Sequence, residues 1–305
     1  MSTTIKALSL AIAAMLVLMT SPISLGQQGT SVYEGDWPSW AGSSNASRYS
    51  PLDQITAENV EDLEIAWRWS TQGFGPGTDF VNPSTPLEID GVLYANVGTT
   101  RNVVALDATS GQVLWMYRYD EGTRFDEAPR KGAGRGVSYY NNGEKSRIFD
   151  ISPGYQLVSL DPATGIPDPS FGEDGLVDLY VGVRNGDDPR FAYPDIGISA
   201  PPFIMNDVIV VGAAHRTGGR PRAKLNTKGD IRGFDVHSGE LLWTFHTIPA
   251  RGEYGYESWI SGNDITGNSG VWAAISGDPE LGHVYLPVED PTGDYYGGDR
   301  HGDNL

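Results

Sequence analysis

The sequence contains no cysteine, and this absence excludes several classes of site at once. Without a thiol among its 305 residues, the chain can form no disulfide, no thiolate metal centre, no Cys-x-x-Cys-His haem attachment and no cysteine-linked lipid anchor. Basic residues are also scarce, because 21 Lys and Arg stand against 39 Asp and Glu, a formal net charge of −18. Nucleic acids and anionic lipids attract clustered cations, so neither kind of partner is expected.

Long apolar runs are lacking too, apart from one at the start of the chain. In residues 1–26, Lys6 precedes the run 7–19, which is too short to span a bilayer comfortably, and Ser24 and Gly26 precede a suitable cleavage point. We therefore expect residues 1–26 to be a signal peptide that exports the protein to the periplasm, with no other membrane span. An uncleaved N-terminal anchor is the alternative.

Turn-forming residues are abundant, which favours an all-β fold. The 39 Gly and 20 Pro fit many short strands joined by tight turns and argue against long helices. Charged residues make up only 20% of the chain and apolar residues 39%, so a sizeable core can be buried and disorder is not expected.

Three segments share the spacing of one tight hairpin. Each has an apolar strand that ends at Asp, then a Gly four residues later, and two of them place a Trp four residues beyond the Gly. Asp is expected to cap the turn, Gly to supply a left-handed backbone angle, and a second strand to carry Trp inward. The segments are Asp107–Gly111–Trp115, Asp161–Gly165 with Pro169 at the Trp position, and Asp235–Gly239–Trp243.

Strand-like runs precede each hairpin, at 86–95, 138–149 and 203–211, and a fourth unit begins at 271–286. Each unit therefore resembles a four-stranded antiparallel blade of a β-propeller. The longer interval before Asp235 predicts an insertion within 167–194. The single helical signal is at 56–63. Because the fourth unit lacks its closing hairpin, we expect the propeller to continue beyond Leu305.

Ordered motifs resemble those of the periplasmic quinoprotein dehydrogenases that use pyrroloquinoline quinone (PQQ), a family that includes methanol, ethanol and membrane glucose dehydrogenases. The matching segments are 36–51, 63–67, 229–235 and 284–298, and the resemblance covers about 35–305. It implies an eight-bladed propeller with PQQ on its axis, of which residues 27–305 would form about the first half. It also implies oxidation of an alcohol, sugar or polyol by hydride transfer to PQQ, with electrons passed to cytochrome c or ubiquinone.

The resemblance assigns cofactor-binding roles to six residues. Arg135 would bind a carboxylate or quinone oxygen, Trp272 would stack under the ring, and Ser199 would donate a hydroxyl hydrogen bond. The backbone of Gly212, Ala213 and Ala214 would cover the other ring face. An ordinary loop arginine and a packing tryptophan are the alternatives for Arg135 and Trp272.

The resemblance also implies a Ca²⁺ or Mg²⁺ site with Asp290 as a ligand, and Glu289 could supply a further hard oxygen. A solvated acidic turn is the alternative. Residues 215–217 contain no carboxylate where methanol-dehydrogenase-like members have a calcium ligand, and the family's adjacent cysteines are absent near Arg130. These departures favour the glucose-dehydrogenase-like branch. The family's catalytic aspartate has no match here and is expected beyond Leu305.

A non-catalytic propeller that serves as a periplasmic scaffold or binding protein is the competing hypothesis. It requires the hairpins but not the axial residues Arg135 and Trp272.

Overall fold

The computed structural model describes residues 35–77, 79–187, 189, 191–216, 225–293, 296–298 and 300–304. The expected signal peptide lies outside these residues. Within the described ranges, no helix is both long and apolar enough to cross a bilayer.

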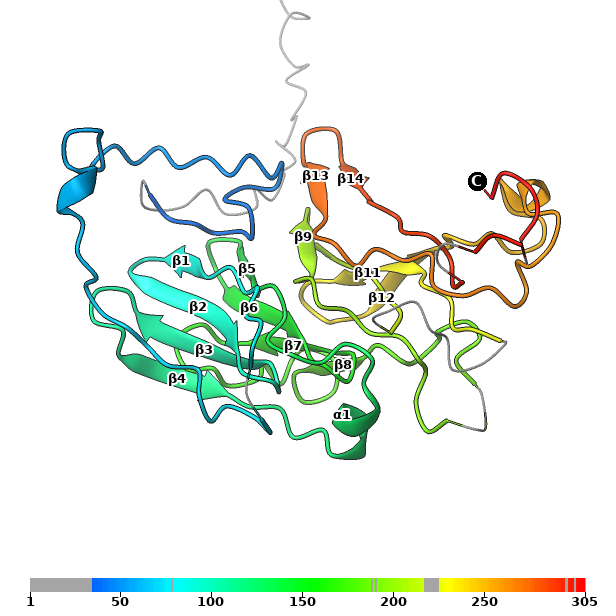
Figure 1. Cartoon of the computed structure of the whole chain (residues 1–305), viewed down its shortest axis with the longest axis horizontal. Coiled ribbons are helices and arrows are strands. Elements are labelled where there is room, and N and C mark those ends of the chain that lie inside the picture. The colour runs from blue at the N-terminus through cyan, green and yellow to red at the C-terminus, as the bar shows by residue number, and fades with distance from the viewer. Residues whose placement is uncertain are drawn as a thin grey trace, which may run out of the picture.

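Three four-stranded antiparallel sheets follow one another along the chain (Figure 1), as the sequence predicted. The first contains β1 (Leu87–Ile89), β2 (Val92–Val97), β3 (Asn102–Asp107) and β4 (Val113–Tyr117). The second contains β5 (Ser138–Asn141), β6 (Ser146–Ile151), β7 (Gln156–Leu160) and β8 (Leu176–Asp178). The third contains β9 (Phe203–Met205), β10 (Val208–Val211), β11 (Ile231–Asp235) and β12 (Leu241–Phe245).

The fourth unit is less regular than the sequence predicted. Its described part pairs only β13 (Ser276–Asp278) with β14 (His283–Tyr285). The residues before Ser276, expected to be a strand, instead form no regular strand and approach the segment that follows β10. A Cβ on Gly270 would lie 2.3 Å from the carbonyl oxygen of Ala213, so the two backbones are in close contact at this point.

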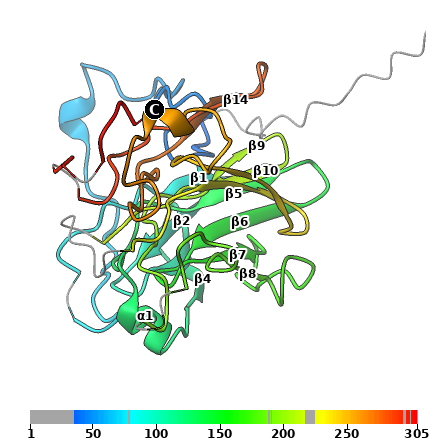
Figure 2. The ribbon, with the colours of Figure 1, turned by 90° about the vertical axis from the view of Figure 1, so that its right-hand side faces the viewer.

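Helices are few and short. The predicted helical segment at 56–63 contains one turn of 3₁₀ helix, η1 (Val60–Asp62). Two further elements were not predicted: α1 (Thr123–Glu127), which precedes the second sheet, and a second 3₁₀ turn, η2 (Tyr256–Ser258). In both views α1 lies at the end of the molecule opposite to β14 (Figure 2).

Two-residue turns set the register of the inner hairpins. Asp90 and Gly91 have φ of 49° and 76°, and Asn206 and Asp207 have φ of 49° and 61°. Two successive positive φ values define the turn whose twist matches that of the flanking strands. These dipeptides therefore join β1 to β2 and β9 to β10, as predicted.

The repeated Asp caps its turn in all three sheets. The Asp107 Oδ1 atom accepts hydrogen bonds from the amides of Thr109 (3.1 Å) and Ser110 (2.7 Å). Asp161 and Asp235 accept equivalent bonds. The glycines four residues later, Gly111, Gly165 and Gly239, have φ of 71°, 70° and 76°. The predicted turn chemistry is thus confirmed.

Tryptophan side chains pack on the Asp turns of the first and second sheets, and Trp115 of β4 thereby links these two sheets. The indole Nε1 of Trp67 donates to the carbonyl of Ala108 (3.0 Å), and that of Trp115 donates to the carbonyl of Pro162 (2.8 Å). Each ring also lies against the glycine of that turn. A Cβ on Gly165 would approach the Trp115 ring to 2.4 Å, which explains why glycine stands there.

Sheets two and three are joined differently, because Pro169 replaces the tryptophan. The Arg147 Nη1 atom donates to the carbonyl of Val236, the position equivalent to Pro162. The Phe171 ring takes the place of the indole, and a Cβ on Gly239 would lie 3.1 Å from it. An arginine and a phenylalanine together thus perform the joining role of one tryptophan.

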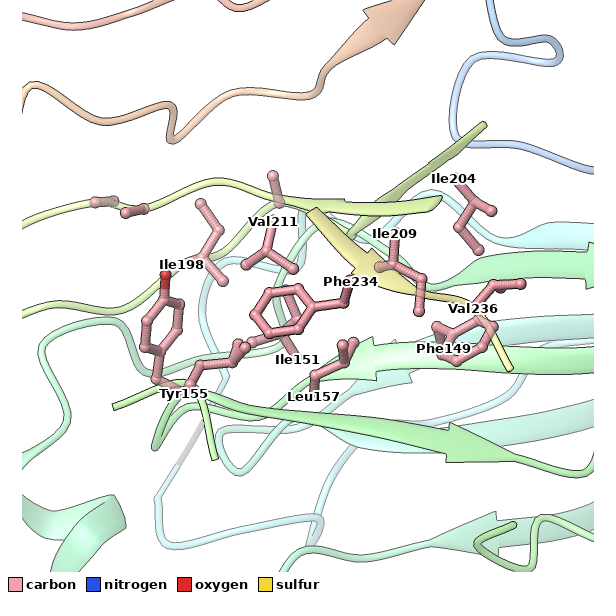
Figure 3. Packing of buried hydrophobic residues seen from close by; sticks show 14 of the residues in the cluster. Phe149, Ile151, Tyr155, Leu157, Ile198, Ile204, Ile209, Val211, Phe234 and Val236 are labelled. Carbon is pink, nitrogen blue, oxygen red and sulfur yellow. The ribbon is translucent and has the colours of Figure 1, made fainter. Parts of the chain in front are cut away.

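The core lies between these sheets (Figure 3). Phe149, Ile151 and Leu157 of the second sheet face Ile209 and Phe234 of the third, and all five are at least 97% buried. A second cluster joins the first sheet to the second. The second sheet is therefore packed on both faces, as expected for consecutive blades.

The first strands of neighbouring sheets lie next to one another. The Ser138 hydroxyl in β5 donates to the carbonyl of Pro202, which directly precedes β9. Near the N-terminus of the described chain, Trp37 pairs with Glu88 of β1, and the carbonyl of Ser44 accepts from the amide of Gly277 in β13. The first strands therefore gather toward one centre, and the loops that lead into them converge.

The docked turn offers a stability test with an internal control. Gly165→Ala is expected to lower the free energy of unfolding by roughly 2–4 kcal/mol, because it adds backbone strain and a clash with Trp115. Gly143→Ala carries the same kind of strain, with φ of 87°, but nothing lies within 4 Å of its Cβ, so about 1 kcal/mol is expected. Urea unfolding of both variants measures the difference, and equal losses would refute the docking role of Gly165.

Candidate functional site

The candidate site is formed by loops that lead into the first strands of the sheets. Arg135 precedes β5, Ser199 precedes β9 and Trp272 precedes β13, while Gly212–Ala214 follow β10. Because β5 and β9 are neighbours and their leading loops converge, these residues can meet although 137 positions separate Arg135 from Trp272 in the numbering.

Arg135 and Trp272 form the centre of this site. The guanidinium carbon of Arg135 lies 4.5 Å from the centroid of the Trp272 indole ring. Partial burial lowers the pKa of Arg135, and Trp272 is 37% exposed. Among the residues that the structure describes, the Arg135 guanidinium makes no hydrogen bond or ion pair. The pair thus presents a partly desolvated cation and an accessible aromatic face together.

Ser199 belongs to the same neighbourhood. The amide of Arg135 donates to the carbonyl of Ser199 at 2.8 Å, and the carbonyl of Arg135 accepts from the amide of Thr85 at 2.9 Å. Ser199 itself is half-buried. The backbone of the Arg135 loop is therefore fixed by the segments that lead into the first and third sheets.

The segment Gly212–Ala214 packs against the backbone of residues 270–271, which directly precede Trp272. The backbone amides of Ala214 and Gly197 each donate to the other residue's carbonyl, at 2.7 and 2.9 Å. A Cβ on Gly212 would lie 2.2 Å from the carbonyl oxygen of Val271. Only glycine permits this approach, so the structure brings all six predicted cofactor residues into one contiguous region.

The carboxylate that points toward this region is Glu289. Its amide donates to the carbonyl of Gly270 (2.9 Å), and its Oε1 atom accepts from Asn268 Nδ2 (2.7 Å). The Nδ1 atom of His215 lies 3.8 Å from Glu289 Oε1. Asp290, the ligand named from the sequence, is exposed. Within the described ranges, no cluster of three or more His, Asp or Glu side chains could hold a metal ion by itself.

Two arginines that sequence reasoning did not assign lie beneath the site. Arg130 donates from Nε to the carbonyl of His215 at 2.5 Å, and burial lowers its pKa although Glu289 opposes this. Arg101 is 1% exposed and hydrogen-bonded to four carbonyls. Neither carries a motif, because their partners are main-chain atoms distant in sequence.

Positive charge is therefore concentrated here in a chain whose net charge is −18. Arg135 stands over the Trp272 indole, and the charges of Arg101, Arg135 and Glu289 all act on Arg130 nearby. A planar ligand could stack on the ring while its acidic groups meet a guanidinium fork. The arrangement suits a flat polyanion.

A family model described as "PQQ: Glucose/ethanol/alcohol dehydrogenase, beta-propeller domain" matches residues 37–305. The chain is 29% identical to the glycerol dehydrogenase large subunit of Gluconobacter oxydans, over 88% of this chain and 36% of that protein. It is 31% identical to the quinoprotein glucose dehydrogenase of Escherichia coli, over 88% of this chain and 34% of that protein. The chain thus spans about a third of the length of these curated relatives.

Solved structures show the same fold. A quinohemoprotein alcohol dehydrogenase of Pseudomonas putida HK5 superposes with a TM-score of 0.66 at 26% identity, covering 85% of this chain and 35% of that one. A europium-containing methanol dehydrogenase superposes with a TM-score of 0.63 at 21% identity, covering 90% and 46%.

Proposed function

Because the chain belongs to the PQQ-dependent glucose/ethanol/alcohol dehydrogenase β-propeller family, we propose that it forms part of a periplasmic quinoprotein dehydrogenase. The proposed substrate is an alcohol, sugar or polyol, and the proposed electron acceptor is cytochrome c or ubiquinone. The observation that carries the proposal is the Arg135 guanidinium on the accessible face of Trp272. A scaffold propeller requires its docking hairpins and gains nothing from this pair.

PQQ fits the residues present. It is a planar ortho-quinone with three carboxylates, and when bound it accepts the hydride removed from a CH–OH group. Trp272 would support the ring, and Ser199 and Arg135 would pair with its oxygens. The guanidinium stays a cation despite its lowered pKa, since an arginine remains protonated in proteins. Binding would move it from the indole face to a ligand carboxylate.

The third side of the site is formed by backbone. Gly212 and Gly270 bring two chain segments into contact next to Val271, the residue before Trp272. We propose that this contact holds the Trp272 backbone in place for stacking, and that Gly212, Ala213 and Ala214 cover the other face of the ligand ring. Such prior ordering of the site reduces the entropy lost on binding.

A Ca²⁺ or Mg²⁺ ion is proposed to bind beside Glu289 and Asp290. Glu289 and Asp290 would contribute carboxylate oxygens to Ca²⁺ or Mg²⁺, the donors that these cations prefer. Since no complete ligand cluster lies within the described residues, the remaining ligands would have to come from the cofactor, from water or from residues outside those ranges.

The function is tested with the full-length gene product that contains this chain. Supplied with PQQ and Ca²⁺ or Mg²⁺, it is expected to reduce an artificial electron acceptor with at least one member of a panel of alcohols, sugars and polyols. Omission of PQQ, and separately chelation of the cation, should each abolish the rate. Absence of turnover across the panel, together with absence of PQQ binding, would support the scaffold hypothesis instead.

A further inference from the structure

Arg101 is a fully buried arginine at the junction of all three complete sheets. It lies in the turn between β2 and β3, and its side chain is among the largest in the described structure with less than 2% exposure. Burial lowers the pKa of Arg101, while the nearby negative charge of Asp150 opposes this. A charge in such a place is costly unless every donor has a partner.

The partners are four main-chain carbonyls on three separate segments. Nε donates to Gly132 (3.1 Å) and Nη2 to Arg130 (2.7 Å), in the loop that leads into β5. Nη1 donates both to Ile151 (2.9 Å) at the end of β6 and to Ile198 (2.7 Å) in the loop that leads into β9. Four of the five N–H donors of one guanidinium are thus used to hold backbone.

Two of these segments carry the candidate cofactor residues. Arg130 and Gly132 belong to the loop of Arg135, and Ile198 directly precedes Ser199. We propose that Arg101 is a positioning residue for PQQ binding, which fixes the Arg135 and Ser199 loops relative to each other through their carbonyls. This inference rests on the proposed function and assigns Arg101 no contact with the ligand.

The tight packing around Arg101 supports a positioning role. A Cβ on Gly134, the residue before Arg135, would lie 2.9 Å from Arg101 Nε. The Arg135 loop therefore rests on the guanidinium itself, and the hydrogen bond from the Arg135 amide to the Ser199 carbonyl (2.8 Å) spans the two held segments. Displacing Arg101 removes the common support of that bond.

Charge explains why arginine, and not a neutral amide, occupies this position. Carbonyl dipoles and the Asp150 carboxylate face the guanidinium, and the Tyr119 hydroxyl donates to Asp150 Oδ2 (2.9 Å). Lysine would keep the charge but provides three donors from a single nitrogen, which cannot span three segments. A lysine variant should consequently recover only part of the function.

The first test compares Arg101→Gln with Arg147→Gln in the full-length gene product. Arg147 is equally buried and also bonds backbone carbonyls, but at the outer joint between sheets two and three. Fluorescence titration of folded protein with PQQ, in Ca²⁺, should give an affinity roughly 10- to 100-fold weaker for Arg101→Gln, as for other outer-shell partners of a site. Arg147→Gln should stay within about threefold of the wild type, since it touches no site segment.

Hydrogen exchange supplies a readout that is independent of PQQ. In Arg101→Gln without ligand, the Arg135 amide should exchange about tenfold faster or more, because its local opening becomes easier. In Arg147→Gln, the exchange rate of the Arg135 amide should rise only by the amount that the general loss of stability explains. If the wild type fails to bind PQQ, the proposed function fails, while the exchange result still decides the role of Arg101.

A glycine pair keeps the proposal testable if Arg101→Gln does not fold. Gly134→Ala and Gly143→Ala both place alanine at positive φ, 77° and 87°, but only the Gly134 Cβ meets Arg101; nothing lies within 4 Å at Gly143, which is outside the Arg135 loop. Gly134→Ala should weaken PQQ binding at least fivefold more than Gly143→Ala, and the PQQ affinity of Arg101→Lys should fall between those of the wild type and Arg101→Gln. Equal affinities within the glycine pair, or wild-type affinity in folded Arg101→Gln, would overturn the proposal.

Discussion

Replacing Arg135 with methionine is expected to weaken PQQ binding roughly 100-fold, equivalent to about 3 kcal/mol. The loss is large because the guanidinium is partly buried, stands over Trp272 at 4.5 Å, and has no hydrogen-bonding or ion-pair partner among the described residues. It is therefore available for a charge-assisted bond to a carboxylate. Methionine keeps most of the length and apolar surface and removes the charge. Isothermal or fluorescence titration with PQQ measures the change.

Arg48→Met is the matched control for that variant. Arg48 also places its guanidinium over an indole, 4.8 Å from the centroid of the Trp40 ring, but it is exposed and is not one of the six candidate cofactor residues. Its replacement should leave PQQ affinity within about twofold, as for surface changes away from a site. The PQQ affinity of Arg135→Lys should lie between the affinities of the wild type and Arg135→Met. The reason is that a lysine ammonium does not offer the two-pronged fork with which a guanidinium pairs with a carboxylate. If Arg135→Met binds PQQ like the wild type, Arg135 is an ordinary loop residue.

The second large effect concerns stability at the joint between sheets two and three. Arg147→Met should lower the free energy of unfolding by about 3–5 kcal/mol, since it leaves the Asp168 carboxylate, whose side chain is 10% exposed, without its buried cation. The Arg147–Asp168 contact is 2.5 Å, and the Arg147 side chain is 3% exposed. The variant also loses the bond to Val236 that replaces a tryptophan indole. Chemical unfolding at pH 7 measures the loss.

Lys145→Met is the control, because Lys145 reaches the same carboxylate at 2.6 Å from an exposed position. Lys145→Met should lower the free energy of unfolding by less than about 1 kcal/mol.

The same ion pair makes the stability depend on pH. Burial of Asp168 acts to raise its pKa, but hydrogen bonds from Lys145 and Ser170 and the Arg147 charge hold this pKa well below its usual range. The group therefore stabilises the fold above about pH 4, the pKa of an unfolded Asp, and this contribution is lost as pH falls below it. Lys145→Met and Arg147→Met should each flatten that acid dependence, and an unchanged profile in both variants would contradict the assignment.

The repeat could be predicted from the sequence because its causes are local. Asp107 caps amides two and three residues away, and Gly111 supplies the left-handed angle. Such short-range chemistry is written in consecutive residues. The hairpin dipeptides Asp90–Gly91 and Asn206–Asp207 were predictable for the same reason, and with them the four-stranded units.

Interactions between sheets were less predictable. Pro169 showed that a tryptophan was absent, but nothing in the sequence indicated that Arg147 and Phe171 would replace it from two different positions. The insertion expected within 167–194 also contains a regular strand, β8. These features depend on how complete sheets meet, which residue spacing within one unit does not determine.

The candidate site was predicted through resemblance and only partly through physics. Arg135 and Trp272 were named from family motifs, and the structure brings them into contact. Arg101 could not be found this way, because it binds carbonyls, which every residue possesses. The inward orientation of Glu289, rather than its neighbour Asp290, depends on the hydrogen bond from Asn268, a contact that no local pattern encodes.

The most direct test of the central claim is a crystal structure of the full-length gene product bound to PQQ. We predict that the ring stacks on Trp272 and that a PQQ carboxylate or quinone oxygen lies about 3 Å from a terminal nitrogen of Arg135. The Arg135 guanidinium should then have left the indole face that it occupies here. A structure with PQQ bound elsewhere, or with Arg135 still stacked on Trp272 and without contact to the ligand, would contradict this assignment.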